Sequence, residues 1–346
     1  MGNLLGIMTH RIPDKSIIRR HGRAAAAARF QGIALYTPQD VNLKKKTVRG
    51  HVLRKGRLTR STVPLPSINL DIGFYSAAQI KKAALVLRSK SMRFAGYGLG
   101  DKKRIQSHLT ASEKLRPYLL PTEPLASPEH GVRFLLQHES IMLKPINGWG
   151  GRGIIRLTAG ARSVNVQRDG KRSLRLPASR LKTYFRRVLR TGRHMMQKWI
   201  DIRNAKGNVF DIRALAQKNG QGQWQLTGMA VREGQRKKIT SNMKGGGKAY
   251  SVLDYLTREF GAERGAELTG SVIEAADYIP SYLEKSYGTR FSELGIDLAA
   301  DRSGKLWLIE VNIKPGKKIM KSVYGRKAWK QSLLNTYRYA RKLARG

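Results

Sequence analysis

A glycine-rich stretch with a strand on each side most constrains the fold of this chain. Residues 148–153 read Gly-Trp-Gly-Gly-Arg-Gly, a spacing that opens a helix in dinucleotide-binding folds. Here the following residues, 154–157, are apolar and β-like, and residues 140–144 before the stretch also form a predicted strand. The stretch therefore joins two strands, which disfavours a dinucleotide-binding fold.

Two other phosphate-binding motifs are incomplete. Protein kinases place a glycine loop between strands over the ATP phosphates, but the sequence has no H-R-D or D-F-G motif. Residues 245–249 resemble a Walker A loop but lack its first glycine spacing and its Ser/Thr. What remains is Lys144, directly before the glycine stretch, where an ammonium can meet phosphate oxygens beneath glycine N–H groups. The alternative is an ordinary strand lysine before a surface loop.

A second group of polar residues predicts a metal site. Residues two apart on a strand share a face, so Glu310 and Asn312 point to one side and Val311 to the other. A tight turn at residues 301–304 brings the strand of Asp297 alongside, opposite Glu310. Two carboxylates and an amide oxygen suit Mg²⁺ that bridges nucleotide phosphates. The alternative is the solvated polar face of a hairpin.

Asp211 and Arg213 also share one strand face. One interpretation is a salt-bridged pair on a sheet. The other has Arg213 reaching a transferred phosphoryl group or a substrate carboxylate, where bidentate geometry favours arginine over lysine.

Composition narrows the class of protein. The 346 residues contain no cysteine, which excludes disulfides, cysteine-ligated zinc and a cysteine nucleophile. The longest apolar runs are far shorter than the ~20 residues of a membrane span. The first residues lack the features of a secretory signal and of a myristoylation site. We therefore expect a cytoplasmic protein without a transmembrane segment.

The charge is large and unevenly distributed. The chain has 67 Lys and Arg against 23 Asp and Glu, a net charge of +44. Residues 141–196 carry 14 basic residues and one acid, residues 317–346 carry ten and none, and 14 of the 23 acids lie between residues 201 and 310. This segregation favours a folded enzyme with a less basic catalytic half. A polyanion such as nucleic acid remains an alternative partner.

The elements alternate in the first hundred residues, with predicted strands at 4–8, 33–36 and 72–75 and helices at 17–30 and 77–87. Such alternation predicts a parallel α/β unit. Asp-Gly at residues 169–170 and the turn at 301–304 predict hairpins. A final helix carries one apolar stripe through Trp329, Leu333, Tyr337, Ala340 and Leu343.

The order of these motifs resembles that of a known superfamily. The motifs are Asp101-Lys102, Lys144-Pro145-Ile146-Asn147-Gly148, Gln197-Lys198-Trp199-Ile200, Phe210-Asp211-Ile212-Arg213, Asn242 with the glycines at 245–247, Gly295-Ile296-Asp297, and Ile309-Glu310-Val311-Asn312-Ile313-Lys314-Pro315-Gly316. They resemble the ATP-grasp superfamily, and within it the YheC/YheD endospore coat-associated branch, clearly over residues 95–316. The resemblance implies an α/β protein with an ATP-grasp fold, in which two α+β subdomains clasp ATP after a parallel α/β pre-ATP-grasp domain. The implied units are residues 1–100, 101–200 (lid subdomain), 201–320 (metal-binding subdomain) and a basic helix at 321–346.

The resemblance also implies residue roles. Lys102 and Lys144 would contact the α and β phosphates under a lid formed by the glycine stretch, which includes Gly148, Gly150, Gly151 and Gly153. The hinge would offer backbone groups of Lys198 and Trp199 to adenine, pack Ile200 on the ring and bring in Gln197, and Asp201 would serve the ribose. Asp297, Glu310 and Asn312 would hold Mg²⁺, and Arg213 and Asn242 would face the γ-phosphate and the acceptor. Trp149 and Gln197 depart from the superfamily's usual small residue and glutamate.

The implied chemistry is ATP-dependent ligation of a carboxylate substrate to an amine acceptor through an acyl-phosphate. Two acids for Mg²⁺, cations for the phosphates and a lid that excludes water suit that chemistry. Two alternatives stay open: a nucleotide-binding spore-coat protein with little turnover, and a basic polyanion-binding protein. The basic segments are expected to meet an acidic substrate, an anionic polymer or spore-coat components.

Overall fold

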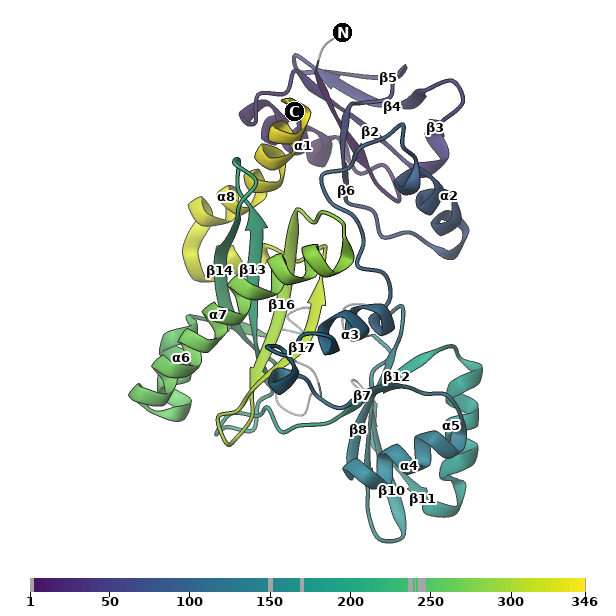
Figure 1. Cartoon of the computed structure of the whole chain (residues 1–346), viewed down its shortest axis with the longest axis vertical. Helices are drawn as coiled ribbons and strands as arrows, with labels where there is room; N and C mark the ends of the chain where they lie inside the picture. The colour runs from purple at the N-terminus through teal and green to yellow at the C-terminus, as the bar shows by residue number, and fades with distance from the viewer. Residues whose placement is uncertain are drawn as a thin grey trace.

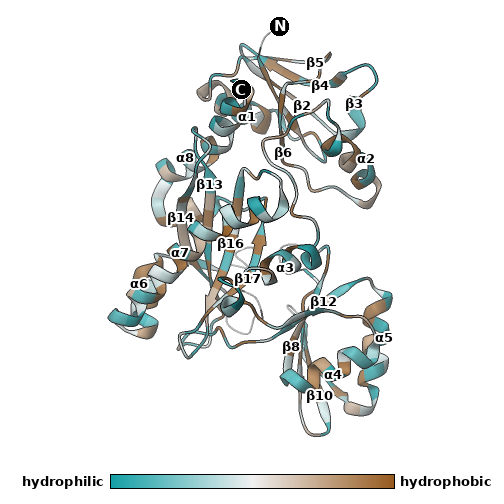
Figure 2. Cartoon of the chain, in the orientation of Figure 1, coloured by the Kyte–Doolittle hydropathy of each residue, from teal (hydrophilic) through white to brown (hydrophobic). Residues whose placement is uncertain are grey.

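Three β-sheets follow one another along the chain in the computed structural model (Figure 1). The structure describes residues 3–148, 152–168, 171–235, 239, 241 and 247–345. Hydrophobic residues concentrate on the strands, as the brown segments of β16 and β17 show (Figure 2). Among the described residues, no helix combines the length and the apolar character needed to cross a bilayer.

The first sheet is only partly parallel. The strand Leu4–Met8 pairs in parallel with Gly32–Tyr36 and with Ile68–Asp71, as the alternating pattern predicted. The third of these strands ends at Asp71, so the strand predicted at residues 72–75 is wrong in its position. A hairpin that was not predicted then adds an antiparallel edge. Its turn residues, Lys55 and Gly56, both have positive φ (44° and 79°), the geometry of a type I′ turn. The elements are β1 (Leu4–Met8), α1 (Lys15–Ala27), β2 (Gly32–Tyr36), η1 (Pro38–Asp40), β3 (Val41–Asn42), β4 (Thr47–Arg54), β5 (Arg57–Pro64), β6 (Ile68–Asp71) and α2 (Ala77–Arg88).

The second sheet is antiparallel and carries two helices. Its strand order is β11-β10-β9-β8-β12-β7, and β10 pairs with β11 as the predicted hairpin. The two helices approach closely at Gly131, where a Cβ atom would lie 2.7 Å from the Phe185 ring. The elements are β7 (Thr122–Pro124), α4 (Pro128–His138), β8 (Ser140–Pro145), β9 (Ile155–Ala159), β10 (Ser163–Arg168), β11 (Leu174–Pro177), η3 (Ala178–Arg180), α5 (Leu181–Arg190) and β12 (His194–Lys198).

The third sheet presents one apolar and one polar face. On β13, Ile212, Ala214 and Ala216 pack in the core with α6 and α7, whereas Asp211 and Arg213 point to the opposite face because side chains alternate along a strand. Its strand order is β15-β14-β13-β16-β17. The elements are β13 (Phe210–Lys218), β14 (Trp224–Glu233), β15 (Lys248–Tyr250), α6 (Val252–Phe260), α7 (Ala262–Tyr287), β16 (Glu293–Ala300) and β17 (Leu306–Asn312).

Residues 101–119 pack with the third sheet, although they open the predicted lid unit 101–200. This segment contains α3 (Lys102–Thr110) and η2 (Arg116–Tyr118). Leu109 and Leu115 lie in the same core as Val272 and Ile296. The α3 helix begins at Lys102 because the Asp101 carboxylate caps it, accepting a hydrogen bond from the Arg104 N–H at 2.9 Å.

The last helical segment, α8 (Lys318–Arg345), packs against two of the units. Ile319 and Met320 pack on Leu215 and Ala230 of the third sheet. Tyr337 and Ala340, from the predicted apolar stripe, enter the core of the first sheet together with Ile18. Gly325, with φ of 78° and ψ of −178°, breaks the helix between these two contacts.

Candidate functional site

A cleft of about 1360 Å³ lies where the three units meet. The second sheet contributes Met142 and Lys144 to its lining, the third contributes Asp211, Asp297 and Glu310, and the first unit contributes Phe74 and Ile80. Typical small-molecule pockets enclose about 300–1,000 Å³. This cleft therefore has room for a nucleotide and a second substrate side by side.

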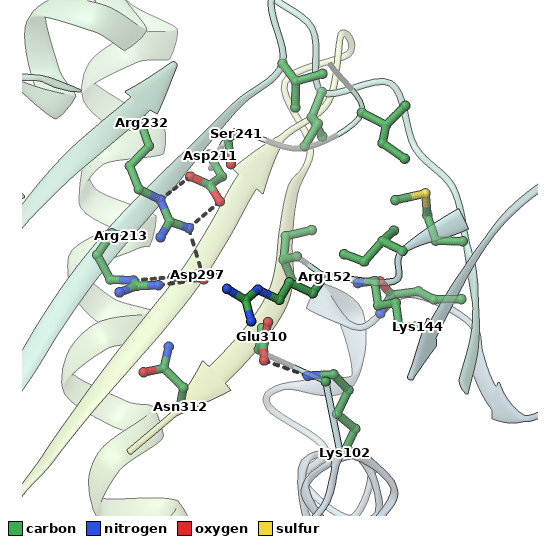
Figure 3. A pocket seen from close by; sticks show the side chains of 18 of the residues that line it. Lys102, Lys144, Arg152, Asp211, Arg213, Arg232, Ser241, Asp297, Glu310 and Asn312 are labelled. Atoms are coloured by element: carbon green, nitrogen blue, oxygen red, sulfur yellow. Dashed lines mark hydrogen bonds and ion pairs between the residues drawn. The ribbon is translucent and has the colours of Figure 1, made fainter. Parts of the chain in front are cut away.

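Charged residues on four neighbouring strands form an alternating array on one wall of the cleft (Figure 3). The strand register places Arg232 opposite Asp211, Arg213 opposite Asp297, and Asp297 opposite Glu310. The last pairing confirms the register expected from the tight turn at residues 301–304. Each side chain therefore faces a partner on the adjacent strand.

Asp211 and Arg213 share a strand face, but they do not pair with each other. Arg213 makes a bidentate pair with Asp297, with its Nη2 atom 2.9 Å from Oδ2. Arg232 donates from Nε to Asp211 Oδ1 at 2.6 Å, and its Nη2 also lies 3.0 Å from Asp297 Oδ2. The interpretation of a local Asp211–Arg213 salt bridge is therefore wrong, because cross-strand neighbours are closer than residues two apart on one strand.

The array keeps Asp297 ionised. Burial alone raises the pKa of the Asp297 carboxyl, but the charges of Arg213 and Arg232 outweigh burial and hold that pKa well below its usual range. Burial likewise opposes the charge of Arg232, and the carboxylates of Asp211 and Asp297 outweigh it and raise the pKa of Arg232. Three arginine N–H groups occupy the Asp297 carboxylate, which leaves it limited capacity for a further ligand.

Glu310 and Asn312 lie on the same wall and face a cation from α3. Lys102 Nζ is 2.8 Å from Glu310 Oε1. Gly295 lies directly opposite Asn312, and a Cβ atom at Gly295 would lie 3.0 Å from the Asn312 amide nitrogen and 2.7 Å from the Pro315 Cβ. Any side chain at position 295 would therefore clash with Asn312 and Pro315, so this position of β16 requires a glycine.

Lys144 faces this wall from the second sheet (Figure 3). Its ammonium donates a hydrogen bond to Gln197 Oε1, and Gln197 Nε2 donates to Thr122 Oγ1 at 3.0 Å. Burial lowers the pKa of Lys144 to about 8; nearby Lys102 acts in the same direction, and the carboxylates of Glu310 and Asp297 act against it. The ammonium is still mostly protonated at pH 7 and has no carboxylate in direct contact.

The predicted hinge lies at the cleft, which Gln197, Lys198, Trp199 and Ile200 all line. The N–H groups of Lys198 and Trp199 donate to the carbonyls of Pro121 and Ser140, each at 2.9 Å. These two donors are therefore engaged in the sheet. Ile200 lines the cleft, and within the described part of the chain its N–H has no hydrogen-bond partner.

The polar residues beside the hinge are engaged in ion pairs and stacking. Asp201 pairs with Arg203 at 2.6 Å and with Arg302 at 3.1 Å. Burial acts to raise the pKa of Asp201, but Arg203 outweighs burial and lowers this pKa. The Arg156 guanidinium lies 3.4 Å from the centre of the Trp199 ring. Burial, together with the charge of Arg203, lowers the pKa of Arg156 to about 10.

The glycine stretch is described only at its ends. Gly148 donates its N–H to the Pro145 carbonyl at 3.0 Å, and Gly153 has a φ of 74°, which favours glycine. Both adjoin the cleft through Pro145. Gly150 and Gly151, Trp149 and the predicted catalytic residue Asn242 lie outside the described residues.

Several cleft residues were missed from the sequence. Arg152 extends between Lys144 and Glu310 (Figure 3). Arg232, Arg156 and Arg203 also line the cleft. The sequence did contain a signal for Arg232. β14 is the hairpin partner of β13, and the register of this hairpin places Arg232 opposite Asp211 on the same face of the sheet.

Comparisons with solved structures identify the fold. Over 99% of both chains, the structure superposes on D-cycloserine synthetase DcsG with a TM-score of 0.57 at 13% sequence identity. The ATP-grasp ligase PsnB, solved with its precursor peptide PsnA2 and AMPPNP, gives a TM-score of 0.53 at 12% identity over 97% of this chain and 98% of that chain. A TM-score of 0.50 at 12% identity relates 91% of this chain to 71% of N5-carboxyaminoimidazole ribonucleotide synthetase, which was solved with ADP. The fold is that of the ATP-grasp proteins, as expected.

Sequence comparison gives the family. The model of the YheC/D like ATP-grasp family matches residues 91–343, so the chain belongs to that family. Two Bacillus subtilis relatives are the endospore coat-associated proteins YheC, 28% identical over 82% of this chain and 80% of YheC, and YheD, 23% identical over 82% of this chain. The match spans 64% of the length of YheD. The resemblance seen in the order of the motifs is confirmed.

Proposed function

We propose that this protein is an ATP- and Mg²⁺-dependent carboxylate–amine ligase. One observation carries the proposal: two lysines, Lys102 and Lys144, face the carboxylates of Asp297 and Glu310 within one large cleft. A nucleotide triphosphate needs cations for its phosphates and hard oxygen ligands for its metal. The ATP-grasp ligase PsnB, which shares this fold, was solved with Mg and ADP.

The nucleotide would lie between the second and third sheets. Lys144 would meet the α and β phosphates, and the glycine stretch would cover them with its N–H groups. Lys102 is paired with Glu310, so it would exchange that carboxylate for a phosphate oxygen when the nucleotide binds. At the hinge, the N–H of Ile200, which has no partner among the described residues, would donate to an adenine ring nitrogen in place of the N–H groups of Lys198 and Trp199.

The residues present fit Mg²⁺ bound together with phosphates. Among the described residues, no three His, Cys, Asp or Glu side chains cluster in a way that would hold a metal by themselves. Asp297, Glu310 and the Asn312 amide oxygen would supply oxygen donors on one wall, and Glu310 meets Lys102 through its Oε1 atom. Mg²⁺ is commonly bound by one or two carboxylates with substrate phosphates and water completing the octahedron. When bound, it would neutralise charge on the phosphates.

In the proposed reaction, a substrate carboxylate oxygen attacks the γ-phosphorus and the bond to the β–γ bridging oxygen breaks, which releases ADP. The amine nitrogen then attacks the acyl carbon, phosphate leaves with the electrons of the C–O bond, and the amine proton passes to solvent. Arg213, which is paired with Asp297, would face the γ-phosphoryl group, and Arg152 extends toward the same wall of the cleft. Asn242 is proposed to face the acceptor.

The biological setting is also proposed from the relatives. YheC and YheD are endospore coat-associated proteins, so we place this protein in the cytoplasm with a role in the spore coat. Its carboxylate substrate and amine acceptor would then include spore-coat components or an anionic polymer. The basic character of the chain fits an acidic substrate.

The test combines binding and turnover. Thermal unfolding of the wild type with saturating Mg-ATP is expected to show stabilisation of about 2.7 kcal/mol at 100 times the dissociation constant. The Glu310→Ala variant should lose most of this shift, whereas Glu274→Ala, an exposed residue of α7, should retain it. A Glu310→Ala variant that is stabilised as fully as the wild type would remove the metal site from the proposal.

Turnover is measured as ADP release with panels of amino acids, short peptides and dicarboxylates. Release that needs both a carboxylate and an amine, and that yields one phosphate per product, supports the ligase. Stabilisation by Mg-ATP without ADP release across these panels would instead define a nucleotide-binding coat protein.

A further inference from the structure

The unit built on the second sheet carries a strongly basic outer surface that does not take part in the cleft. We call it the arginine face and define it by eight exposed cations, five on or beside α5 (Arg180, Arg186, Arg187, Arg190 and Arg193) and three in the turns at the two ends of β10 (Arg162, Lys171 and Arg172). Within the described part of the chain, none of the eight side chains makes an ion pair or a hydrogen bond. None of them lines the cleft.

The arginine face carries little compensating charge. Residues 152–193 contain 13 basic residues and one acid, Asp169, and on α5 the neighbouring Lys182 pairs with Glu129 of α4. In the cleft, by contrast, Arg213 and Arg232 each meet a carboxylate directly. Like charges on a small unit repel and destabilise its compact state, so this surface has a net cost that an anionic partner would relieve.

The cations of α5 are held on a rigid support. Leu181, Tyr184, Phe185 and Val188 are buried against the second sheet, which turns Arg186 and Arg190 to solvent on the same side of the helix. Residues four apart on a helix are separated by about 6 Å along its axis. Figure 1 shows α5 on the side of this unit away from β16 and β17.

The surroundings of these cations select the kind of partner. The core of a protein–protein interface is enriched in aromatic and apolar residues, yet in residues 152–168 and 171–193 the only exposed large hydrophobic residue is Leu174. The aromatic residues of these two described ranges, Tyr184 and Phe185, are buried, so these ranges offer no stacking platform for single-stranded bases and no apolar face for insertion into a membrane.

A partner recognised by charge alone remains, and the phosphate backbone of a duplex, with one negative charge per ~1.7 Å of its axis, is such a partner. We propose that the arginine face binds the phosphate backbone of duplex nucleic acid without reading its sequence. Because the face and the cleft share no residue, this binding is independent of the proposed ligase reaction.

The experiment measures binding of a fluorescent 20-base-pair duplex by anisotropy at several salt concentrations. The test variant replaces Arg180, Arg186, Arg187 and Arg190 by glutamine. The matched control replaces Arg49, Arg54, Arg57 and Arg60 by glutamine; these are four exposed arginines of the β4–β5 hairpin that likewise have no partner in the described structure. Both variants lose the same charge, so total charge is held equal. A third variant with lysine at the four α5-side positions keeps the charge.

We expect the test variant to bind the duplex at least about tenfold more weakly at 100 mM salt, with a salt slope smaller by about 3 to 4. The control variant and the lysine variant should stay within about threefold of the wild type. Equal losses in the test and control variants would overturn the proposal, because binding would then follow net charge alone. Full competition by polyglutamate or by vesicles with 30% phosphatidylserine, at equal charge concentration, would also overturn it. If the fourfold glutamine variant unfolds, the double variants Arg186→Gln/Arg190→Gln and Arg57→Gln/Arg60→Gln make the same comparison with half the charge removed, and equal losses in these two would overturn the proposal.

Discussion

Replacement of Arg232 by methionine tests whether the charged array on β13, β14 and β16 organises the cleft. Arg232 is the partner of Asp211 and also contacts Asp297. Asp211 is buried, with 9% of its side chain exposed, and the structure gives it no other ion pair among the described residues. Asp297 would keep its bidentate pair with Arg213. The cost of the substitution should therefore fall mainly on Asp211.

Breaking a buried ion pair by removing one partner costs about 3–5 kcal/mol, because a buried charge is left uncompensated. We expect Arg232→Met to lower the free energy of unfolding by an amount at the lower end of this range, about 3 kcal/mol. The double variant Arg232→Met/Asp211→Leu removes both charges and should recover at least about 2 kcal/mol of that loss. Lys182→Met, which breaks an exposed pair with Glu129, should cost at most about 1 kcal/mol.

The assay is urea unfolding followed by tryptophan fluorescence, since Trp224 lies on the same strand as Arg232. A loss below about 1 kcal/mol for Arg232→Met, or single-variant losses that simply add in the double variant, would refute the reasoning. The ion pairs of the array would then contribute to stability independently of one another, as solvent-exposed ion pairs do.

Three further perturbations follow from the structure. Because burial lowers the pKa of Lys144 to about 8, Mg-ATP binding measured by calorimetry should weaken above pH 8, by up to about tenfold per pH unit. The Lys144→Arg variant should show a flatter dependence on pH. If its pH dependence equals that of the wild type, Lys144 does not contact the phosphates. Burial, with Arg20 and Lys317, lowers the pKa of His21 to about 4, so the unfolded chain takes up a proton near pH 6.5 before the folded one does. Stability measured by urea unfolding should then fall between pH 6.5 and 4 by at most about 3 kcal/mol, and His21→Gln should remove this part of the pH dependence. In α7, a Cβ atom at Gly265 would lie 2.5 Å from the Thr257 nitrogen, whereas a Cβ atom at Gly270 would meet open space. Gly265→Ala should therefore destabilise the fold by about 1–3 kcal/mol, and Gly270→Ala should stabilise it by about 0.5–1 kcal/mol. Similar shifts in the thermal unfolding temperature for both variants would contradict this packing.

Local patterns predicted several of the elements and part of the site. The hairpin of β16 and β17 was predicted because its short turn sets the register, and that register alone places Asp297 opposite Glu310. The order of the motifs predicted the family and the fold. The β4–β5 hairpin was missed because its turn has Lys-Gly where Asn-Gly or Asp-Gly is the usual signal.

The sequence by itself determined which residues have chemistry to offer: the lysine before a glycine stretch, the acids at alternate strand positions, and an uneven positive charge. Only the tertiary structure decided how they pair. Arg213 meets Asp297 across 84 residues, and α8 joins the cores of two units through residues on either side of Gly325. Such pairings depend on which strands and helices become neighbours, and no local propensity specifies those neighbours. The pairing of Arg232, and the roles proposed for the Ile200 N–H and for the arginine face, therefore follow from packing and strand register, which bring distant charges together or leave them exposed to solvent.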